Sequence, residues 1–124
     1  MRAHQAAVKA IKSQYPAIKV GVTLSLHDVQ VIDDSPEAAQ QAEKEWDAEF
    51  KHYIPYIKND DFLGVQNYTR SLISANGQEV APKDSKLTQM GYEVYPEALE
   101  HVIRTVAKDF HQEILVTENG IGTS

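Results

Sequence analysis

Apolar residues recur at spacings of three and four in three stretches of the chain, and this pattern predicts three amphipathic helices. The first is expected over residues 2–14. The second follows a Ser35 cap, has Pro36 in its first turn and runs to about Tyr53, and the third opens at Pro96. The residues expected to face inward are Ala3, Ala6, Ala7, Ala10 and Ile11 in the first helix, Ala39, Ala42, Trp46, Phe50 and Tyr53 in the second, and Leu99, Val102, Ile103, Val106 and Phe110 in the third.

Three short runs rich in β-branched and apolar residues alternate with these helices and predict three strands. They are residues 18–26 (IKVGVTLSL), 61–68 (DFLGVQNY) and 113–117 (EILVT). Strands that are separated by single helices pair in parallel through right-handed crossovers. After the second strand, Asn76-Gly77 stands between Leu72-Ile73 and Val80, so a small hairpin or excursion is expected there.

The predicted fold is therefore α/β, with three helix–strand units and parallel strands. No linker or repeat divides residues 1–124, which are expected to form a single segment. Parallel sheets normally have both faces covered, and a sheet of three strands leaves two edges open. The last strand also lies near the end of the sequence. We expect either a piece of a larger α/β barrel or sheet, or a chain that assembles with copies of itself or with a partner.

Composition narrows the classes of function. The 124 residues include 18 acidic and 12 basic side chains, giving a net charge of −6, which disfavours nucleic acid and anionic membranes as partners. No stretch approaches the roughly 20 apolar residues that span a bilayer. The chain has no cysteine, which excludes disulfides and a thiolate nucleophile and fits a cytoplasmic location. No histidine pair has convincing ligand spacing with a carboxylate, so no metal site is expected.

Polar clusters follow each predicted strand directly. In parallel α/β folds, reactive groups collect at the carboxyl ends of the strands. These ends carry His27-Asp28, then Gln66-Asn67-Tyr68, and finally Glu118-Asn119. Glu118 is the sharpest candidate, because it follows an apolar run and precedes a turn; the alternative is a solvated acid at that turn. His27 either lines the outer part of a cleft or is a rim histidine with a local hydrogen bond, and we favour the second interpretation.

Four stretches resemble one enzyme family. Residues 113–124 (EILVTENGIGTS) resemble the nucleophile segment of the family 1 glycoside hydrolases, the retaining β-glucosidases and their relatives, at the seventh strand of a (β/α)₈ barrel. Residues 21–27 (GVTLSLH) and 61–70 (DFLGVQNYTR) resemble the fifth and sixth strands, and residues 91–99 (GYEVYPEAL) resemble the segment before the next helix, with Tyr92 where Trp is usual. The ordered matches cover nearly the whole chain and imply a partial TIM barrel containing strands five to seven.

The resemblance also assigns roles to individual residues. It implies that Glu118 is the catalytic nucleophile of a retaining β-glycosidase and that Tyr68 donates a hydrogen bond to orient it. Gln66, Asn67, Asn119 and His27 are expected at the substrate site. Gln66 stands where the family has an Asn, and it keeps the amide but adds a methylene. Asn67 stands where the family has a Tyr; the alternative is that it faces away from the site. No cofactor is expected, because two carboxyl groups and water carry out this chemistry.

The family's acid/base lies in an Asn-Glu-Pro segment on the fourth strand, and this sequence contains no Asn-Glu-Pro. The fourth strand would precede Met1, and the eighth would follow Ser124. Two interpretations remain. In the first, the chain hydrolyses a β-glycoside, most simply a β-glucoside with galactosides and fucosides not excluded, once the missing barrel half or self-association supplies the rest of the site. In the second, it is a non-catalytic α/β module that oligomerises through its open edges and binds sugar weakly at most.

Overall fold

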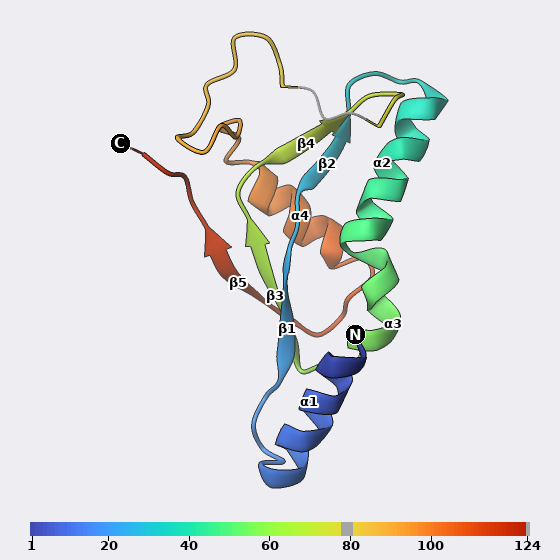
Figure 1. Ribbon diagram of the computed structural model, residues 1–124, viewed down its shortest axis with the longest axis vertical. Helices are drawn as coiled ribbons and strands as arrows, with labels where there is room; N and C mark the ends of the chain where they lie inside the picture. The colour runs from blue at the N-terminus through green and yellow to red at the C-terminus, as the bar shows by residue number, and fades with distance from the viewer. Residues whose placement is uncertain (78–80, 124) are drawn as a thin grey trace.

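The computed structural model describes residues 1–77 and 81–123, in which helices and strands alternate along the chain (Figure 1). Ser35 caps the second helix by accepting a hydrogen bond from the Ala38 N–H. The elements, in chain order, are α1 (Arg2–Gln14), β1 (Gly21–Ser25), β2 (Asp28–Val31), α2 (Pro36–Glu49), the 3₁₀ turn η1 (Lys51–Tyr53), α3 (Ile54–Ile57), β3 (Phe62–Asn67), β4 (Arg70–Ile73), α4 (Ala98–Val106) and β5 (Glu113–Asn119).

All strand pairs between these elements are parallel. One sheet has the order β1-β3-β5, and β2 pairs with β4 in a second, two-stranded sheet. The second sheet extends the first, since β2 follows β1 after Leu26-His27 and β4 follows β3 after Tyr68-Thr69. Parallel pairing of the three main strands, predicted from their separation by helices, is confirmed.

The structure describes part of the predicted hairpin or excursion. Residues 70–73 form β4, which pairs in parallel with β2, far back in the sequence. The turn itself is present: Gly77 N–H donates to the Ser74 carbonyl, and Gly77 has the positive φ of 72° that glycine tolerates best. The second arm, at Val80, lies outside the described residues. The dipeptide indicated a local turn, while the partner of β4 is set by long-range packing.

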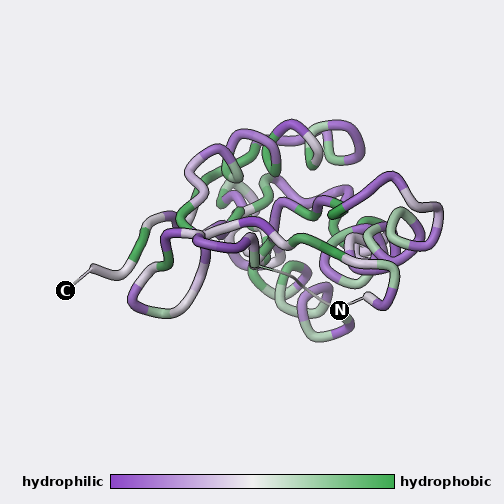
Figure 2. Tube along the Cα trace, turned by 90° about the horizontal axis from the view of Figure 1, so that it is seen from above, coloured by the Kyte–Doolittle hydropathy of each residue, from purple (hydrophilic) through white to green (hydrophobic). Residues whose placement is uncertain are grey.

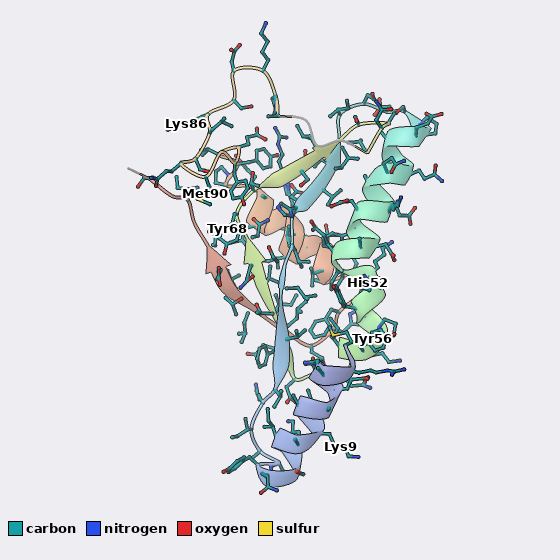
Figure 3. The ribbon with its side chains drawn as sticks, viewed as in Figure 1. Lys9, His52, Tyr56, Tyr68, Lys86 and Met90 are labelled. Atoms are coloured by element: carbon teal, nitrogen blue, oxygen red, sulfur yellow. The ribbon has the colours of Figure 1, made fainter. Side chains whose placement is uncertain are left out.

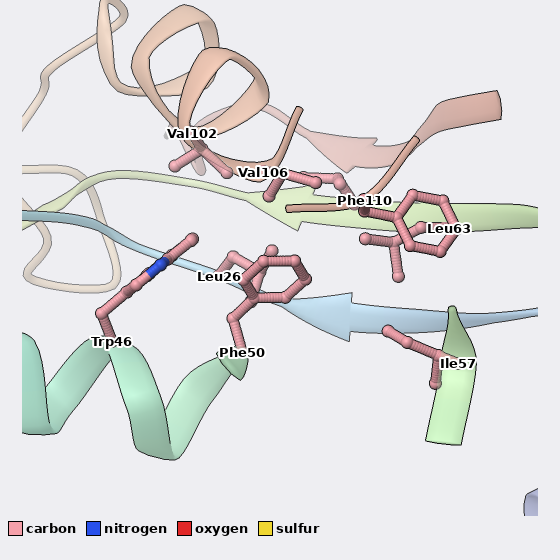
Figure 4. Close-up of a cluster of buried hydrophobic side chains, with 9 residues drawn as sticks. Leu26, Trp46, Phe50, Ile57, Leu63, Val102, Val106 and Phe110 are labelled. Atoms are coloured by element: carbon pink, nitrogen blue, oxygen red, sulfur yellow. The ribbon is translucent and has the colours of Figure 1, made fainter. Parts of the chain in front are cut away.

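One hydrophobic cluster joins the helices to the sheet (Figure 4). Phe50, Ile57, Leu63 and Val106 are fully buried in it, and Trp46 packs on Phe50 with ring centroids 5.1 Å apart. The inward face predicted for the third helix is confirmed at Val102, Val106 and Phe110, although the regular helix ends at Val106. In the second helix, Ala38 is buried and Ala39 is exposed, so the predicted face is shifted by one residue at its start.

The alanine face of α1 does not pack inward, contrary to the sequence expectation. Ala3, Ala6, Ala7, Ala10 and Ile11 are all exposed. The helix is instead held by polar contacts to the turn before β3: the His4 imidazole lies 2.6 Å from Asp60, and Lys12 donates to Asp61 at 2.5 Å. His4, Val8 and Lys12 are half-buried, so the docked face of α1 is the one that contacts Asp60 and Asp61 and not the alanine face.

The C-terminal strand is the least covered part of the sheet. Figure 2 shows a hydrophobic stretch in the C-terminal segment at the margin of the molecule. In β5, only Ile114 is half-buried, and Leu115 and Val116 are 40% and 47% exposed. None of the helices in residues 1–77 and 81–123 is long and apolar enough to cross a membrane.

Candidate active site

A bulge in β5 sets the position of the candidate nucleophile. Val65 of β3 pairs with Val116, but the next residue, Gln66, pairs with Glu118, so Thr117 is an extra residue on β5. Such bulges bend a strand and re-aim the side chains that follow. Without the extra residue, Gln66 would face Thr117. The bulge therefore places Glu118 directly beside Gln66.

Thr117 packs below Glu118 on the same side of the sheet. Its hydroxyl lies 2.7 Å from the Thr23 hydroxyl on β1 and donates to the Val65 carbonyl at 3.3 Å. Gly64 of β3 leaves room for this contact, because a Cβ there would lie 2.7 Å from the Thr23 hydroxyl and 3.0 Å from the Thr117 methyl group. A glycine and two threonines thus form a tight layer across all three strands, beneath the layer that contains Gln66 and Glu118.

Both carboxylate oxygens of Glu118 accept hydrogen bonds from β3 or the residue after it. Tyr68 donates its phenol proton to Oε2, and Gln66 Nε2 donates to Oε1 at 2.8 Å. The bond to Glu118 raises the pKa of Tyr68 above its ordinary value, with burial and the charge of Glu118 adding to the effect. Tyr68 therefore remains a proton donor throughout the neutral range. Together the two donors fix the plane of an acceptor carboxylate.

Tyr68 also lines a hollow of about 450 Å³ beside this pair. Its other walls come from the loop before α4 and from the segment that follows β5, including Met90, Tyr92, Asn119 and Ile121. Figure 3 shows Tyr68 near the end of β3, with Met90 beyond it. Cavities of roughly 300–1,000 Å³ with apolar walls and a few polar groups are typical of small-molecule sites. The arrangement can hold an uncharged polar ligand with an apolar substituent near the carboxyl group that Tyr68 contacts.

Two of the other predicted site residues come from adjacent strands. Asn119 lines the hollow and donates from Nδ2 to the Asn67 carbonyl at 2.8 Å, so it is positioned next to Glu118. The Asn67 side chain is 1% exposed, and its Nδ2 donates to the carbonyls of Leu26 and Thr69 at 2.8 and 3.0 Å. Asn67 therefore links the end of β1 to the start of β4. This geometry favours the alternative interpretation, in which Asn67 faces away from the site.

His27 lies apart from the Glu118 pair in its contacts. Its backbone N–H and its ring Nδ1 both reach the Glu49 carboxylate, at 2.9 and 2.7 Å. It lines one hollow of about 320 Å³ with Trp46 and Lys51, and a second of about 330 Å³ with Arg70 and Tyr92. The contacts to Glu49 favour the interpretation of His27 as a rim histidine with a local hydrogen bond.

The sequence analysis missed an ion pair that holds the loop of the hollow. The Arg70 guanidinium donates to both oxygens of Glu93, each at 2.8 Å, and lies 3.9 Å from the centre of the Tyr95 ring. Arg70 and Glu93 side chains are only 17% and 15% exposed. The Arg70 guanidinium lowers the pKa of Glu93 below its ordinary value. Because Arg70 follows Tyr68 by two residues and Glu93 follows Tyr92 by one, this pair connects two walls of the hollow.

A second polar contact near the first was also missed. Asp28 of β2 accepts from His101 of α4 at 2.6 Å and from Gln30 at 2.6 Å, and Gln30 in turn accepts from Arg70 at 3.1 Å. DVQV alternates polar and apolar residues, which is typical of a strand with one polar face and could have indicated β2. RSLI does not alternate, so no such pattern indicated β4, and both runs directly follow other strands.

Solved structures of glycosidases resemble the chain over nearly its full length. A β-glycosidase, BGL167, is 35% identical and superimposes with a TM-score of 0.87, over 98% of this chain and 28% of that one. A β-glucosidase, 1317, is 33% identical, with a TM-score of 0.84 over 99% of this chain and 29% of that one. A family 1 β-glucosidase from Thermotoga maritima shares the fold, at 18% identity and a TM-score of 0.79, over 97% of this chain and 35% of that one.

The chain is similar, in sequence and in fold, to a fragment of a glycoside hydrolase. No protein-family model matches it. The partial TIM barrel predicted from the sequence is confirmed, with three parallel strands and their helices. The chain spans less than a third of the length of BGL167 and of β-glucosidase 1317, so the activity of a whole enzyme does not transfer to it directly.

Proposed function

We propose that this segment takes part in the hydrolysis of β-glycosidic bonds with retention of configuration, with Glu118 as the nucleophile. The observation that carries the proposal is the carboxylate at the end of β5, whose two oxygens are held by Gln66 and Tyr68 beside a ligand-sized hollow. The similarity to a β-glycosidase and a β-glucosidase supports it.

The chemistry requires an ionised carboxylate at this position. Glu118 attacks the anomeric carbon and forms a covalent glycosyl ester, while the leaving oxygen takes a proton from a second carboxyl group. Water then attacks the ester and restores Glu118. Tyr68 keeps its proton because it faces Glu118, so it holds the nucleophile without neutralising it. No cofactor enters this scheme, since two carboxyl groups and water complete it.

The proposal needs a second carboxyl group about 5–5.5 Å from Glu118. By the resemblance it belongs to an Asn-Glu-Pro segment, which the sequence lacks, so another part of the barrel must bring it. The edges of β1 and β5 are where further parallel strands can add, because within residues 1–77 and 81–123 each of these strands is paired on one side only, by β3. We take the substrate to be a β-glucoside and the location to be cytoplasmic, as the cysteine-free composition favours.

Covalent trapping tests the nucleophile without the missing acid. An activated 2,4-dinitrophenyl 2-deoxy-2-fluoro-β-glucoside has a leaving group that needs little protonation, and its glycosyl ester accumulates. Mass spectrometry of the digested chain should find the sugar on the peptide that contains Glu118. Glu113→Gln, at the other end of β5, should still be labelled, and Glu118→Gln should not. Labelling of both variants alike, or of neither wild type nor control, would contradict the proposal.

Turnover separates the whole reaction from the first step. Unfluorinated activated aryl glucosides, galactosides and fucosides should be hydrolysed at rates that rank the sugar preference, and Glu118→Gln should abolish each rate. A folded chain that traps the fluorosugar and hydrolyses none of them holds the nucleophile only.

Exposed apolar residues in β5 and in the segment after it favour a second candidate function. Leu115 and Val116 of β5 are 40% and 47% exposed and Ile121 beyond it is 52% exposed, which suits a module that associates through its edge. Sedimentation equilibrium of wild type and Leu115→Lys distinguishes the candidates. An oligomer that Leu115→Lys dissociates, in a chain that does not trap the sugar, would favour the non-catalytic module.

A further inference from the structure

We propose that Gln66 is a positioning residue for Glu118, holding one carboxylate oxygen while Tyr68 holds the other, so that the carboxylate keeps a single orientation. This inference rests on the proposed function of Glu118 as nucleophile. It assigns Gln66 a contact with the nucleophile in addition to the place near the sugar that the resemblance implies.

The backbone of Gln66 is fixed on both sides. On one side it is in register with Ser25 of β1, and its carbonyl accepts the Leu26 N–H at 2.8 Å. On the other side it pairs with Glu118 across the bulge. Because both Cα positions are held by the sheet, the amide needs only to select a side-chain rotamer to reach Oε1.

The length of the Gln66 side chain decides whether the contact forms. The resemblance places an Asn at this position, which is shorter by one carbon–carbon bond of about 1.5 Å. The Nε2–Oε1 distance is 2.8 Å, and hydrogen bonds of this kind rarely exceed about 3.2 Å. An Asn amide on the same backbone would therefore fall short of Glu118. The additional methylene is what allows the amide of Gln66 to donate a hydrogen bond to Glu118.

The two donors differ in kind from an ion pair. Within residues 1–77 and 81–123, Glu118 accepts hydrogen bonds from an amide and a phenol and forms no salt bridge with Lys, Arg or His. Neutral donors orient a carboxylate and favour its ionised form while leaving its full negative charge. This suits a group that must attack a carbon developing positive charge.

Nuclear magnetic resonance of the wild-type chain and three variants tests the inference. Gln66→Met keeps the length and removes the amide, Gln66→Asn keeps the amide and shortens the side chain, and Gln112→Met makes the same exchange just before β5, at the end far from Glu118. The ¹³C shift of the Glu118 carboxyl carbon, measured at one neutral pH, reports the hydrogen bonds that this carboxyl group accepts. Loss of the bond from Gln66 should move this shift away from its wild-type value.

Gln66→Met and Gln66→Asn should both show this change, and Gln112→Met should match wild type. An unchanged Glu118 carboxyl shift in Gln66→Met overturns the inference, and a wild-type shift in Gln66→Asn overturns the claim about length. Glu118→Gln should in turn move the side-chain amide shifts of Gln66, which tests the contact from its other side; unmoved amide shifts also overturn the inference. Failure of fluorosugar trapping with these shift changes intact would reject the nucleophile and leave the Gln66 contact standing.

Discussion

β3 and β5 have similar sequences and adjoin each other in one sheet, yet they differ in burial. FLGVQN is buried at Leu63, Gly64, Val65 and Asn67, whereas EILVTEN is exposed everywhere except at Ile114. β3 has a strand on each side and lies in the cluster built by the helices; β5 has one neighbour, β3. Hydrophobic stabilisation follows the area removed from water, so equal apolar residues stabilise these two strands unequally.

The same contrast separates the two parts of the site. Glu118 lies on the exposed strand, and its two partners, Gln66 and Tyr68, lie on or next to the packed strand. The donors are thus placed by the core, while Glu118 depends on the sheet pairing and the bulge. The packed strand β3 therefore orients a carboxylate on the exposed strand β5.

Truncating one leucine in β3 and one in β5 should give the largest difference in the free energy of unfolding. Leu63→Ala removes a fully buried side chain and should lower the free energy of unfolding by about 2–5 kcal/mol. Leu115→Ala, at 40% exposure, should cost less than about 1 kcal/mol. Urea denaturation followed by circular dichroism measures both. Equal losses would mean that β5 is covered in solution, for example by a second copy of the chain.

The next largest difference in stability is expected between breaking the half-buried ion pair of Arg70 and breaking the exposed ion pair of Lys19. Arg70→Lys keeps the charge but loses the two-pronged bond to Glu93 and the stacking on Tyr95, and should cost about 1.5–3 kcal/mol. Lys19→Ala breaks an exposed pair with Glu113 at the start of β5 and should lower the stability much less than Arg70→Lys, because water and salt screen exposed charges. Thermal unfolding of each variant decides; a Lys19 effect as large as that of Arg70 would contradict the burial argument.

The Arg70–Glu93 pair should also make stability depend on pH. The pKa of Glu93 is lowered in the folded chain, so the folded state favours its ionised form. This contribution is fully present above the unfolded value of 4.5 and is lost as pH falls through the lower folded pKa. Unfolding measured from pH 6 to about 3 should show a steeper loss in wild type than in Glu93→Gln. Parallel curves would show that Glu93 titrates alike in both states.

The smallest expected effect is a spectroscopic one at the site. The ionised Glu118 raises the pKa of Tyr68, so Glu118→Gln should lower the Tyr68 titration midpoint, while Glu113→Gln should leave it unchanged. The ¹³C shift of the Tyr68 ring carbon that bears the hydroxyl separates it from the other tyrosines. A midpoint unaffected by Glu118→Gln would mean that the bond does not persist in solution.

The sequence determined the elements that depend on local patterns. Helical spacing located the helices, and short β-branched runs located β1, β3 and β5 within a few residues. The order of these elements implied parallel strands, and the Glu118 and Tyr68 segments pointed to a carboxylate and a phenol that the structure brings together. Polar residues at strand ends meet because parallel strands share one carboxyl edge, which is a property of the order alone.

Only the tertiary structure decided which faces are covered and which side chains meet. The alanines of α1 are exposed because Asp60 and Asp61 bind its other side, and Asn67 is buried because carbonyls of two strands lie within its reach. The bulge at Thr117, which brings Gln66 to Glu118, is a matter of register between residues some fifty positions apart. Apolar periodicity in a sequence indicates which side chains are buried. It does not indicate which part of the fold packs against them.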